Sequence, residues 1–279
     1  MAKQLRRLSL GFLASGILAC GPLAEQSSQT KIYGGIKSKT GDWLNTVAIS
    51  DGHGIFCSGT AINPRLILTA AHCAKGNTEG NPARIKIYVG EGSEGGTVPS
   101  QYTAKKINLS PSYGRDPKGW NDIAYIVLDK DLTLPEASFT KVLMDKGETE
   151  ELLQVNATAH LVGFGIRNDG GYGIKFETDA RITQVGENEV NIGSHGHDSC
   201  QGDSGGPAFA QLKTGEWRVF GIVSRGGACG TGGVYGRMNA NICWVEEDSK
   251  ISLGLSPEFC AKSSEGPHRA DHNGPMKLK

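Results

Sequence analysis

The sequence predicts an all-β protein built from two antiparallel β-barrels and one late helix. The chain has 40 glycines among 279 residues, and glycines spread between short apolar segments indicate many turns and short strands. These apolar segments fall into two groups along the chain, as expected for two barrels. One segment near the end of the second group, residues 241–251, has the apolar spacing of a helix instead.

Each group contains four clear strand-like segments. In the first group they cover residues 45–50, 65–70, 84–90 and 122–129, and in the second 157–165, 180–186, 216–224 and 232–238. Residues 91–100 and 110–120 are rich in turn-forming residues, so loops are expected there. The charged, irregular segment 133–151 is expected to link the two halves.

The charge balance excludes one class of function. The chain has 29 basic and 29 acidic residues, a formal net charge of zero, and no long basic segment. Nucleic-acid binding is therefore not expected.

The N-terminal segment has the pattern of an export signal. Lys3, Arg6 and Arg7 precede the apolar segment 8–19, which is short for a membrane span. The segment ends in "ILAC", which resembles a bacterial lipobox, so we expect cleavage before Cys20 and lipidation of that cysteine. Cleavage at an ordinary signal-peptidase site nearby remains the alternative. Export from a bacterial cell also predicts an oxidising environment and paired cysteines.

Three separated motifs carry the candidate chemistry. "TAAHC" contains His72, "NDIAYIVLD" contains Asp122 at its second position, and "GDSGGP" contains Ser204. A serine hydroxyl needs a base such as histidine, and the imidazole needs an acceptor that fixes its tautomer. The oxyanion that forms needs preset donors, and Gly202 presents its backbone N–H without a Cβ in the way. Each residue alone has an ordinary structural explanation, whereas together they supply a nucleophile, a base and an orienting carboxylate.

In this order the three motifs resemble those of the trypsin-like (chymotrypsin-fold) serine proteases, over about residues 32–250. The resemblance implies two Greek-key barrels packed together, with the active site at their interface and a C-terminal helix. It also implies His72 as general base, Asp122 as orienting residue, Ser204 as nucleophile, and the amides of Gly202 and Ser204 as the oxyanion hole.

Three other aspartates compete for the orienting role, namely Asp116, Asp129 and Asp131. Asp122 is preferred because it matches the D-I-A that begins the corresponding strand of the family.

The resemblance also implies the substrate. The residue six positions before the nucleophile lies at the bottom of the pocket for the substrate side chain, here Asp198, and its carboxylate selects Arg or Lys. The other pocket residues implied are Ser224, Gly226 and Gly233. Arg225 stands where trypsins usually have Trp, which adds a charge and leaves the preference for flanking residues open, acidic residues included.

An activation site is expected at "KIYGG". In the family, cleavage after the basic residue, here Lys31, exposes an amine on the next residue, Ile32, which pairs with the aspartate before the nucleophile, Asp203. Tyr33 departs from the usual Val. Because Cys20 precedes Lys31, the same cleavage would release the enzyme from its lipid, and a trypsin-like pocket would accept Lys31 and allow self-activation.

Seven cysteines leave six once Cys20 is set aside, enough for three disulfides. The resemblance implies Cys57–Cys73 and Cys200–Cys229, whereas Cys243–Cys260 follows from parity alone. We expect no cofactor and no metal, because the loop that begins at Glu91 is too short and glycine-rich to complete a calcium shell.

The expected organisation is therefore a lipoprotein-type signal peptide, a spacer or activation propeptide, a protease domain and a polar tail, at residues 1–19, 20–31, 32–252 and 253–279. Within the protease domain, barrel one is expected at about 45–135, barrel two at about 152–238 and the helix at 241–251. The expected enzyme is a monomer that acts on proteins or peptides and binds protein inhibitors.

Three rival functions fit less well. A catalytically silent binding module normally lacks one of the three catalytic residues, and all three are present here. An esterase more often has G-x-S-x-G with serine before histidine, the opposite of the order in this chain. A periplasmic quality-control protease would be expected to carry a peptide-binding domain after residue 250.

Overall fold

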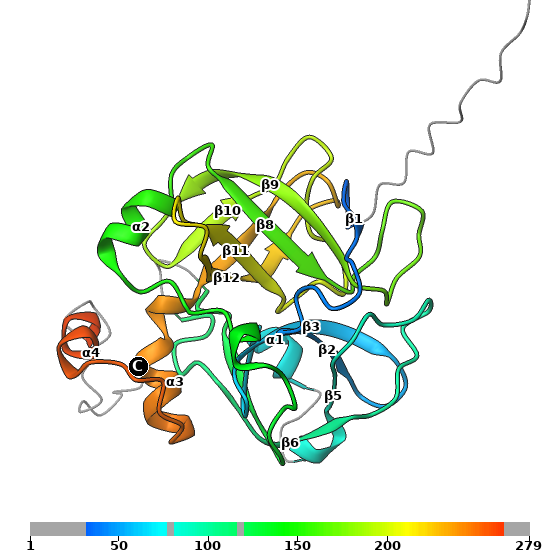
Figure 1. Cartoon of the computed structure of the whole chain (residues 1–279), viewed down its shortest axis with the longest axis horizontal. Coiled ribbons are helices and arrows are strands. Elements are labelled where there is room, and N and C mark those ends of the chain that lie inside the picture. Colours follow the sequence, from blue (N-terminus) through cyan, green and yellow to red (C-terminus); the bar gives the residue numbers. More distant parts are fainter. Residues whose placement is uncertain (1–31, 77–80, 116–119, 265–279) are drawn as a thin grey trace, which may run out of the picture.

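The computed structural model describes residues 32–76, 81–115 and 120–264, with side chains to 261 (Figure 1). The signal segment, Cys20 and Lys31 lie outside this part, as do Asp116 and the tail from 265 onward. Among the described residues, no helix has both the length and the apolar character needed to cross a bilayer.

The first half of the chain closes into an antiparallel barrel of six strands, with the spatial order β2-β3-β4-β7-β6-β5. The strands are β2 Thr46–Ser50, β3 Ile55–Asn63, β4 Leu66–Thr69, β5 Lys86–Tyr88, β6 Tyr102–Leu109 and β7 Ala124–Leu128. Pairing of β2 with β5 closes the barrel. Each of its six strands therefore pairs with a neighbour on both sides.

The second half repeats this arrangement in the order β8-β9-β10-β13-β12-β11, closed by pairing of β8 with β9. The strands are β8 Thr158–Gly163, β9 Phe176–Val185, β10 Glu189–Ile192, β11 Pro207–Gln211, β12 Trp217–Gly226 and β13 Gly233–Arg237. The short strand β1, Ile36–Lys37, pairs with β9. The predicted all-β class with two Greek-key barrels is therefore confirmed, and Figure 1 shows one barrel above the other.

The two barrels share one hydrophobic core where they meet. Val47 and Leu68 of the first barrel belong to the same buried cluster as Phe209 and Ile222 of the second. Because apolar burial is worth roughly 25 cal/mol per Å², this shared cluster strongly favours docking of the barrels. The docking surface is also where the three candidate motifs lie.

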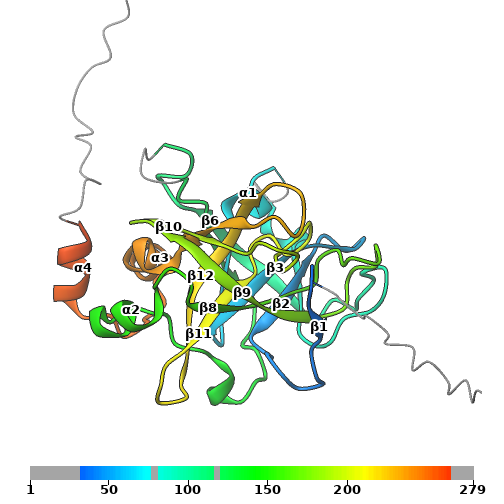
Figure 2. The same ribbon diagram turned by 90° about the horizontal axis from the view of Figure 1, so that it is seen from above.

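In the described part of the chain, four α-helices lie outside the barrels, namely α1 Ala71–Ala74, α2 Lys146–Leu152, α3 Ile242–Ser249 and α4 Pro257–Ser264. The prediction of a helix at 241–251 corresponds to α3, which buries Ile242 and Val245 and ends at Lys250 in the left-handed conformation. Figures 1 and 2 show α2, α3 and α4 gathered on the same side of the molecule. The described residues also form three short 3₁₀ turns, Pro82–Arg84, Glu136–Ser138 and Met238–Ala240.

Helices α2 and α4 were not predicted, and both depend on local capping. The Asp145 side chain accepts the backbone N–H of Glu148 at the start of α2, at 2.9 Å. At the start of α4, the Ser256 hydroxyl accepts the N–H of Phe259, at 3.1 Å, and Pro257 occupies the first helical position. Part of the segment expected to be an irregular polar tail is therefore helical.

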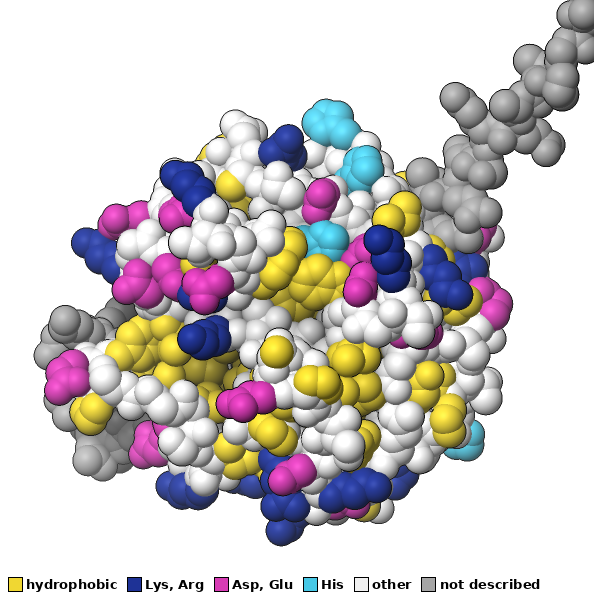
Figure 3. Space-filling model, in the orientation of Figure 1, with side chains coloured by type: hydrophobic (Ala, Val, Ile, Leu, Met, Phe, Trp, Pro, Cys, Tyr) yellow, Lys and Arg dark blue, Asp and Glu magenta, His cyan; other side chains and the backbone are white. Residues whose placement is uncertain are grey.

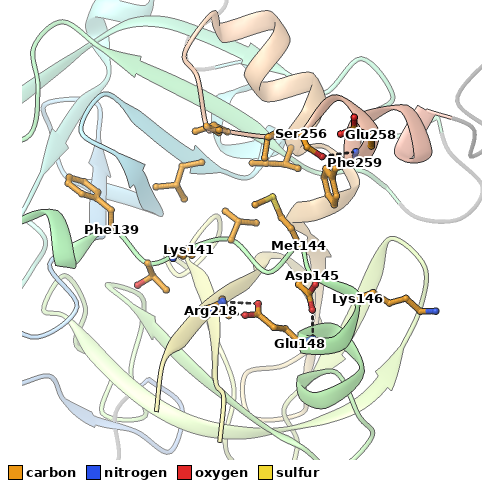
Figure 4. Close-up of a pocket in the computed structure, with 17 residues that line it drawn as sticks. Phe139, Lys141, Met144, Asp145, Lys146, Glu148, Arg218, Ser256, Glu258 and Phe259 are labelled. Carbon is orange, nitrogen blue, oxygen red and sulfur yellow. Dashed lines mark hydrogen bonds and ion pairs between the residues drawn. The ribbon is translucent and has the colours of Figure 1, made fainter. Parts of the chain in front are cut away.

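A groove of about 950 Å³ lies between the linking segment, α2 and the segment that leads into α4. Its lining is partly apolar and includes Met144 and Phe259, and the Arg218–Glu148 ion pair lies at its border (Figure 4). Apolar side chains also gather at the left of Figure 3, where Figure 1 places this region. None of the predicted site residues lines this groove.

Candidate active site

His72 and Asp122 lie in direct contact at the junction of the barrels. His72 is in α1, directly after β4, and Asp122 precedes β7, the strand paired with β4. The Nδ1 atom of His72 is 2.7 Å from Oδ2 of Asp122, and the His72 backbone N–H donates to Oδ1 at 2.9 Å. Because an ionised carboxylate only accepts, Nδ1 must carry the proton, which leaves Nε2 able to accept one.

A third hydrogen bond reaches the same carboxylate. The Ser224 hydroxyl donates to Oδ2 of Asp122 at 2.7 Å, and both side chains are buried. Ser224 was predicted as a residue of the substrate pocket, and the structure shows that its hydroxyl also binds the aspartate. The two competing aspartates within the described residues have other partners, since Asp129 accepts the Thr103 N–H and Asp131 pairs with Arg65.

Ser204 lies in a tight turn that precedes β11, and two contacts place it beside the imidazole. Its carbonyl accepts the backbone N–H of Ser58 at 2.8 Å. The sulfur of Cys73 lies 3.5 Å from that same carbonyl oxygen and 3.7 Å from Nε2 of His72. The serine turn and the ring nitrogen that can accept a proton are therefore neighbours around one sulfur atom.

Glycine is required on both sides of this turn. Gly205 has a φ of +81°, and a Cβ there would lie 2.1 Å from Oγ1 of Thr69. Gly202 has a φ of +94°, and a Cβ would lie 2.9 Å from Cα of Gly165. Within the described residues, the backbone N–H groups of Gly202 and Ser204 have no acceptor, so both can donate to an added oxyanion.

Asp203 is fully buried behind the serine turn. Its carboxylate accepts the N–H groups of Gly165, at 2.8 Å, and Cys200, at 2.9 Å. Burial raises its pKa to about 7 although these hydrogen bonds lower it. Among the described residues it has no cationic partner, because no ion pair includes it.

Asp198 is buried beside glycines of the predicted substrate pocket. Oδ1 accepts the N–H of Ser199 at 2.7 Å, and Oδ2 accepts that of Gly232 at 2.8 Å. Burial raises the pKa of this carboxyl group above its ordinary value, while the backbone hydrogen bonds act against the rise. Close approach is possible because Gly193 has no side chain, where a Cβ would lie 2.9 Å from Oδ1.

The two glycines predicted to keep the pocket open are register partners. Gly226 ends β12 directly opposite Gly233, which begins β13. Both line a cavity of about 410 Å³ together with Gly193 and Gly232. Asp198 does not line this cavity itself, but its Oδ2 is bonded to the N–H of Gly232, which does.

The three predicted disulfides are present in the structure, linking Cys57 to Cys73, Cys200 to Cys229 and Cys243 to Cys260. The first holds β3 beside α1, the second holds the serine loop to the pocket wall, and the third joins α3 to α4. Paired cysteines are typical of exported proteins. The cluster of Cys57, Cys73 and His72 offers no thiolate to a metal because both cysteines are oxidised.

Sequence reasoning missed one residue of the site, Ser58, and one contact, that of Ser224 with Asp122. Ser58 helps to hold the serine turn in place, because its hydroxyl also donates to the carbonyl of Gly202 at 3.0 Å. Ser224 binds Asp122 across 102 positions in the chain. The only sequence signal for Ser58 was its place next to Cys57 in the predicted disulfide.

Comparison with known proteins agrees with this geometry. Residues 32–245 match the family model described as Trypsin. A relative described as a trypsin-like protease, from Streptomyces glaucescens, is 27% identical over 274 residues, which cover 91% of this chain and 95% of that protein. The chain therefore belongs to the trypsin family and is a trypsin-like serine endopeptidase, a hydrolase of peptide bonds in proteins.

Proposed function

We propose that this endopeptidase cleaves after Arg or Lys through an acyl-enzyme, with Asp198 as the residue that selects the substrate. The observation that carries this proposal is a buried carboxylate that lies behind the glycines lining a cavity of about 410 Å³ and is hydrogen-bonded to one of them, Gly232. A buried carboxylate without a cation is costly, and a substrate guanidinium or ammonium would offset that cost with a charge-assisted hydrogen bond.

The proposed catalytic steps assign one role to each of these side chains. Nε2 of His72 accepts the proton of the Ser204 hydroxyl as its oxygen attacks the scissile carbonyl. The carbonyl oxygen becomes negative and is stabilised by the N–H groups of Gly202 and Ser204. His72 then gives its proton to the leaving amine, and water hydrolyses the acyl-enzyme with the same histidine as base. Asp122 holds the ring in the required tautomer throughout.

Replacing Asp198 by asparagine should lower kcat/KM for Arg and Lys substrates by about 10² to 10³-fold. The buried substrate cation would lose its partner, which typically costs about 3–5 kcal/mol, and 1.4 kcal/mol is tenfold. Peptide amides with Arg, Lys, Phe or Ala before the cleaved bond measure this effect. Asp131→Asn, at the exposed ion pair with Arg65, is the matched control and should keep the Arg preference. Equal activity of the natural enzyme on Phe and Arg would refute the assignment of the pocket.

We also infer that the enzyme is made as a zymogen, which cleavage after Lys31 activates. Ile32 is 1% exposed and has a φ of +40°, a conformation that β-branched residues rarely adopt. Tyr33 follows it next to the pocket, because its carbonyl accepts the Asp198 N–H at 3.0 Å. Cleavage would relieve the constraint at Ile32 and create an amine that can pair with the buried carboxylate of Asp203.

The pH dependence of stability should distinguish the two forms. In the uncleaved chain the pKa of Asp203 is about 7, above the value of about 3.9 for an unfolded Asp. The unfolded chain therefore binds fewer protons between these values, and stability should fall by up to about 1.4 kcal/mol per pH unit as pH rises from 4 to 7. A chain that begins at Ile32 should lack this fall, because an amine then favours the carboxylate.

Urea unfolding of inactive Ser204→Ala protein, with and without residues 20–31, measures this difference. Asp203→Asn in the longer chain is the control and should give the flatter profile, since asparagine does not titrate. Equal pH slopes for the longer and shorter chains would contradict the proposed pairing of the amine with Asp203.

The export pattern supports a lipid-anchored precursor, with Cys20 carrying the lipid and cleavage after Lys31 releasing a monomeric enzyme to the periplasm or the extracellular space. Cys20 is the only cysteine that precedes Ile32, so no disulfide would hold the two pieces together. Active enzyme that still carries acyl chains, detected by intact mass, would contradict this proposal.

A further inference from the structure

Arg225 does not present a free charge to the substrate. Its two terminal nitrogens donate to the two carboxylate oxygens of Glu189, at 2.7 and 2.8 Å. The Glu189 side chain is 17% exposed and that of Arg225 34%. Burial raises the pKa of Glu189, but hydrogen bonds from Arg225 and Trp120 outweigh it and hold this pKa below its usual range. The positive charge expected from the sequence is therefore largely cancelled.

An aromatic ring covers the same ion pair. The guanidinium carbon of Arg225 lies 4.9 Å from the centre of the Trp120 ring, within the range of a cation–π contact. The Trp120 backbone N–H donates to Oε1 of Glu189 at 2.7 Å, so one carboxylate fixes both partners. One face of the indole is used in this stack, yet 51% of Trp120 remains exposed. We call these three residues the Trp120 cluster.

The position of the Trp120 cluster follows from the active site. Trp120 lies two positions before Asp122, and Arg225 follows Ser224, whose hydroxyl binds Asp122. The two chain segments that build the orienting carboxylate therefore continue outward together and bring the indole over the guanidinium. Arg225 also lines the cavity formed by the pocket glycines.

The strand beside this cluster has an open edge. β11 pairs with β12 only as far as Ile222, which lies opposite Pro207. At the next residue, Val223, the carbonyl accepts the N–H of Gly205 and the N–H donates to the carbonyl of Gly206. Beyond that point, among the described residues, β12 has β13 on one side and no strand on the other. An extended peptide can add to such an edge through main-chain hydrogen bonds, with side-chain pockets giving specificity.

We propose that the Trp120 cluster is a subsite that selects an aromatic or large aliphatic residue two or four positions before the cleaved bond. Side chains alternate along an extended peptide. Because the residue before the cleaved bond enters the Asp198 pocket, the second and fourth residues face the other way. There they meet the exposed indole and a neutralised arginine, so acidic residues gain nothing. This inference extends the proposed Arg and Lys specificity.

Matched peptide amides test the subsite, each with Arg before the cleaved bond and with Phe, Ala or Asp at the second or fourth position. For the natural enzyme, kcat/KM should be about tenfold higher with Phe than with Ala at the preferred position, since burying a large apolar side chain is worth roughly 1.5–3 kcal/mol when complete. Trp120→Ala should bring this ratio close to one, whereas Trp120→Phe should keep most of it.

Glu189→Gln tests the neutralised charge. Arg225 would lose its partner, so the ratio of kcat/KM for Asp over Ala should rise about three- to tenfold. This gain should shrink in 1 M salt, where charges are screened over about 3 Å. Glu148→Gln is the matched control, because Glu148 pairs in the same two-bond manner with Arg218 on the same strand, outside the site. Glu148→Gln should change neither the Phe-over-Ala nor the Asp-over-Ala ratio of kcat/KM.

Equal rates with Phe and Ala in the natural enzyme, or a preference for Asp, would overturn the subsite. Cleavage of a blocked single-residue arginine amide tests the proposed Arg specificity alone, because this substrate has no side chain for the Trp120 cluster. Failure of the subsite and failure of the proposed function can therefore be distinguished. If that amide resists cleavage, the flanking ratios are measured with the residue that the enzyme does accept. A Glu189→Gln enzyme that remains indifferent to Asp would refute the role of Glu189 as the neutralising partner.

Discussion

Replacement of Ser204 by alanine is expected to lower kcat by about a millionfold. No acyl-enzyme can form without the hydroxyl, and water must then attack the substrate without a positioned nucleophile. His72→Ala should cost about as much, because the serine hydroxyl has no base within reach. The double variant should be no worse than either single one, since nucleophile and base act as a unit.

Initial rates with an arginine amide, together with unfolding curves for each variant, would measure this effect. Ser199→Ala, on the same loop, is the comparison; its hydroxyl accepts a hydrogen bond from Tyr235 at 2.9 Å, and its loss should be far smaller. If the losses of Ser204→Ala and His72→Ala multiplied in the double variant, the two residues would be acting independently, against the proposed mechanism.

The second large effect is expected from Asp122→Asn, about a 10⁴-fold decrease in kcat. The natural carboxylate accepts three hydrogen bonds, from the ring and backbone of His72 and from Ser224. An amide has only one acceptor oxygen, so its NH₂ group can face Nδ1 and move the ring proton to Nε2. A ring protonated at Nε2 cannot take the proton of the serine.

Ser224→Ala separates tautomer control from simple loss of a hydrogen bond. It removes one donor from Asp122 but leaves the carboxylate to fix the ring, so its kcat should fall by roughly tenfold at most, as for a hydrogen bond to a charged group worth about 1.5 kcal/mol. Full pH–rate profiles of both variants would measure the difference. Similar losses in the two variants would argue against tautomer control by Asp122.

Short motifs shared with the family were enough to predict His72 and Asp122 as neighbours. His72 and Asp122 stand at the ends of apolar strands, and those strands pair in the barrel. The Ser224–Asp122 hydrogen bond and the Arg225–Glu189 pair could not be predicted in this way. Both depend on cross-strand register between segments far apart in sequence, which no single motif contains.

Secondary structure was predictable where apolar periodicity was strong. β3 was missed because its sequence mixes Cys, Ser, Gly and Thr with apolar residues, although most of the strand is buried. β11 was missed because it begins with Pro207, which reads locally as a turn residue. α4 was missed because its stability comes from the Cys243–Cys260 disulfide and one capping serine rather than from an apolar face.

The division of the site between two like barrels has a consequence for how the protein is made. The proposed base and its carboxylate belong to the first barrel, whereas the turn that carries the proposed nucleophile precedes β11 in the second. A nascent or half-folded chain thus holds an incomplete set of catalytic groups, whichever barrel forms first. Under the proposed mechanism, hydrolysis would begin only after the barrels dock, so the architecture itself would protect the producing cell during synthesis.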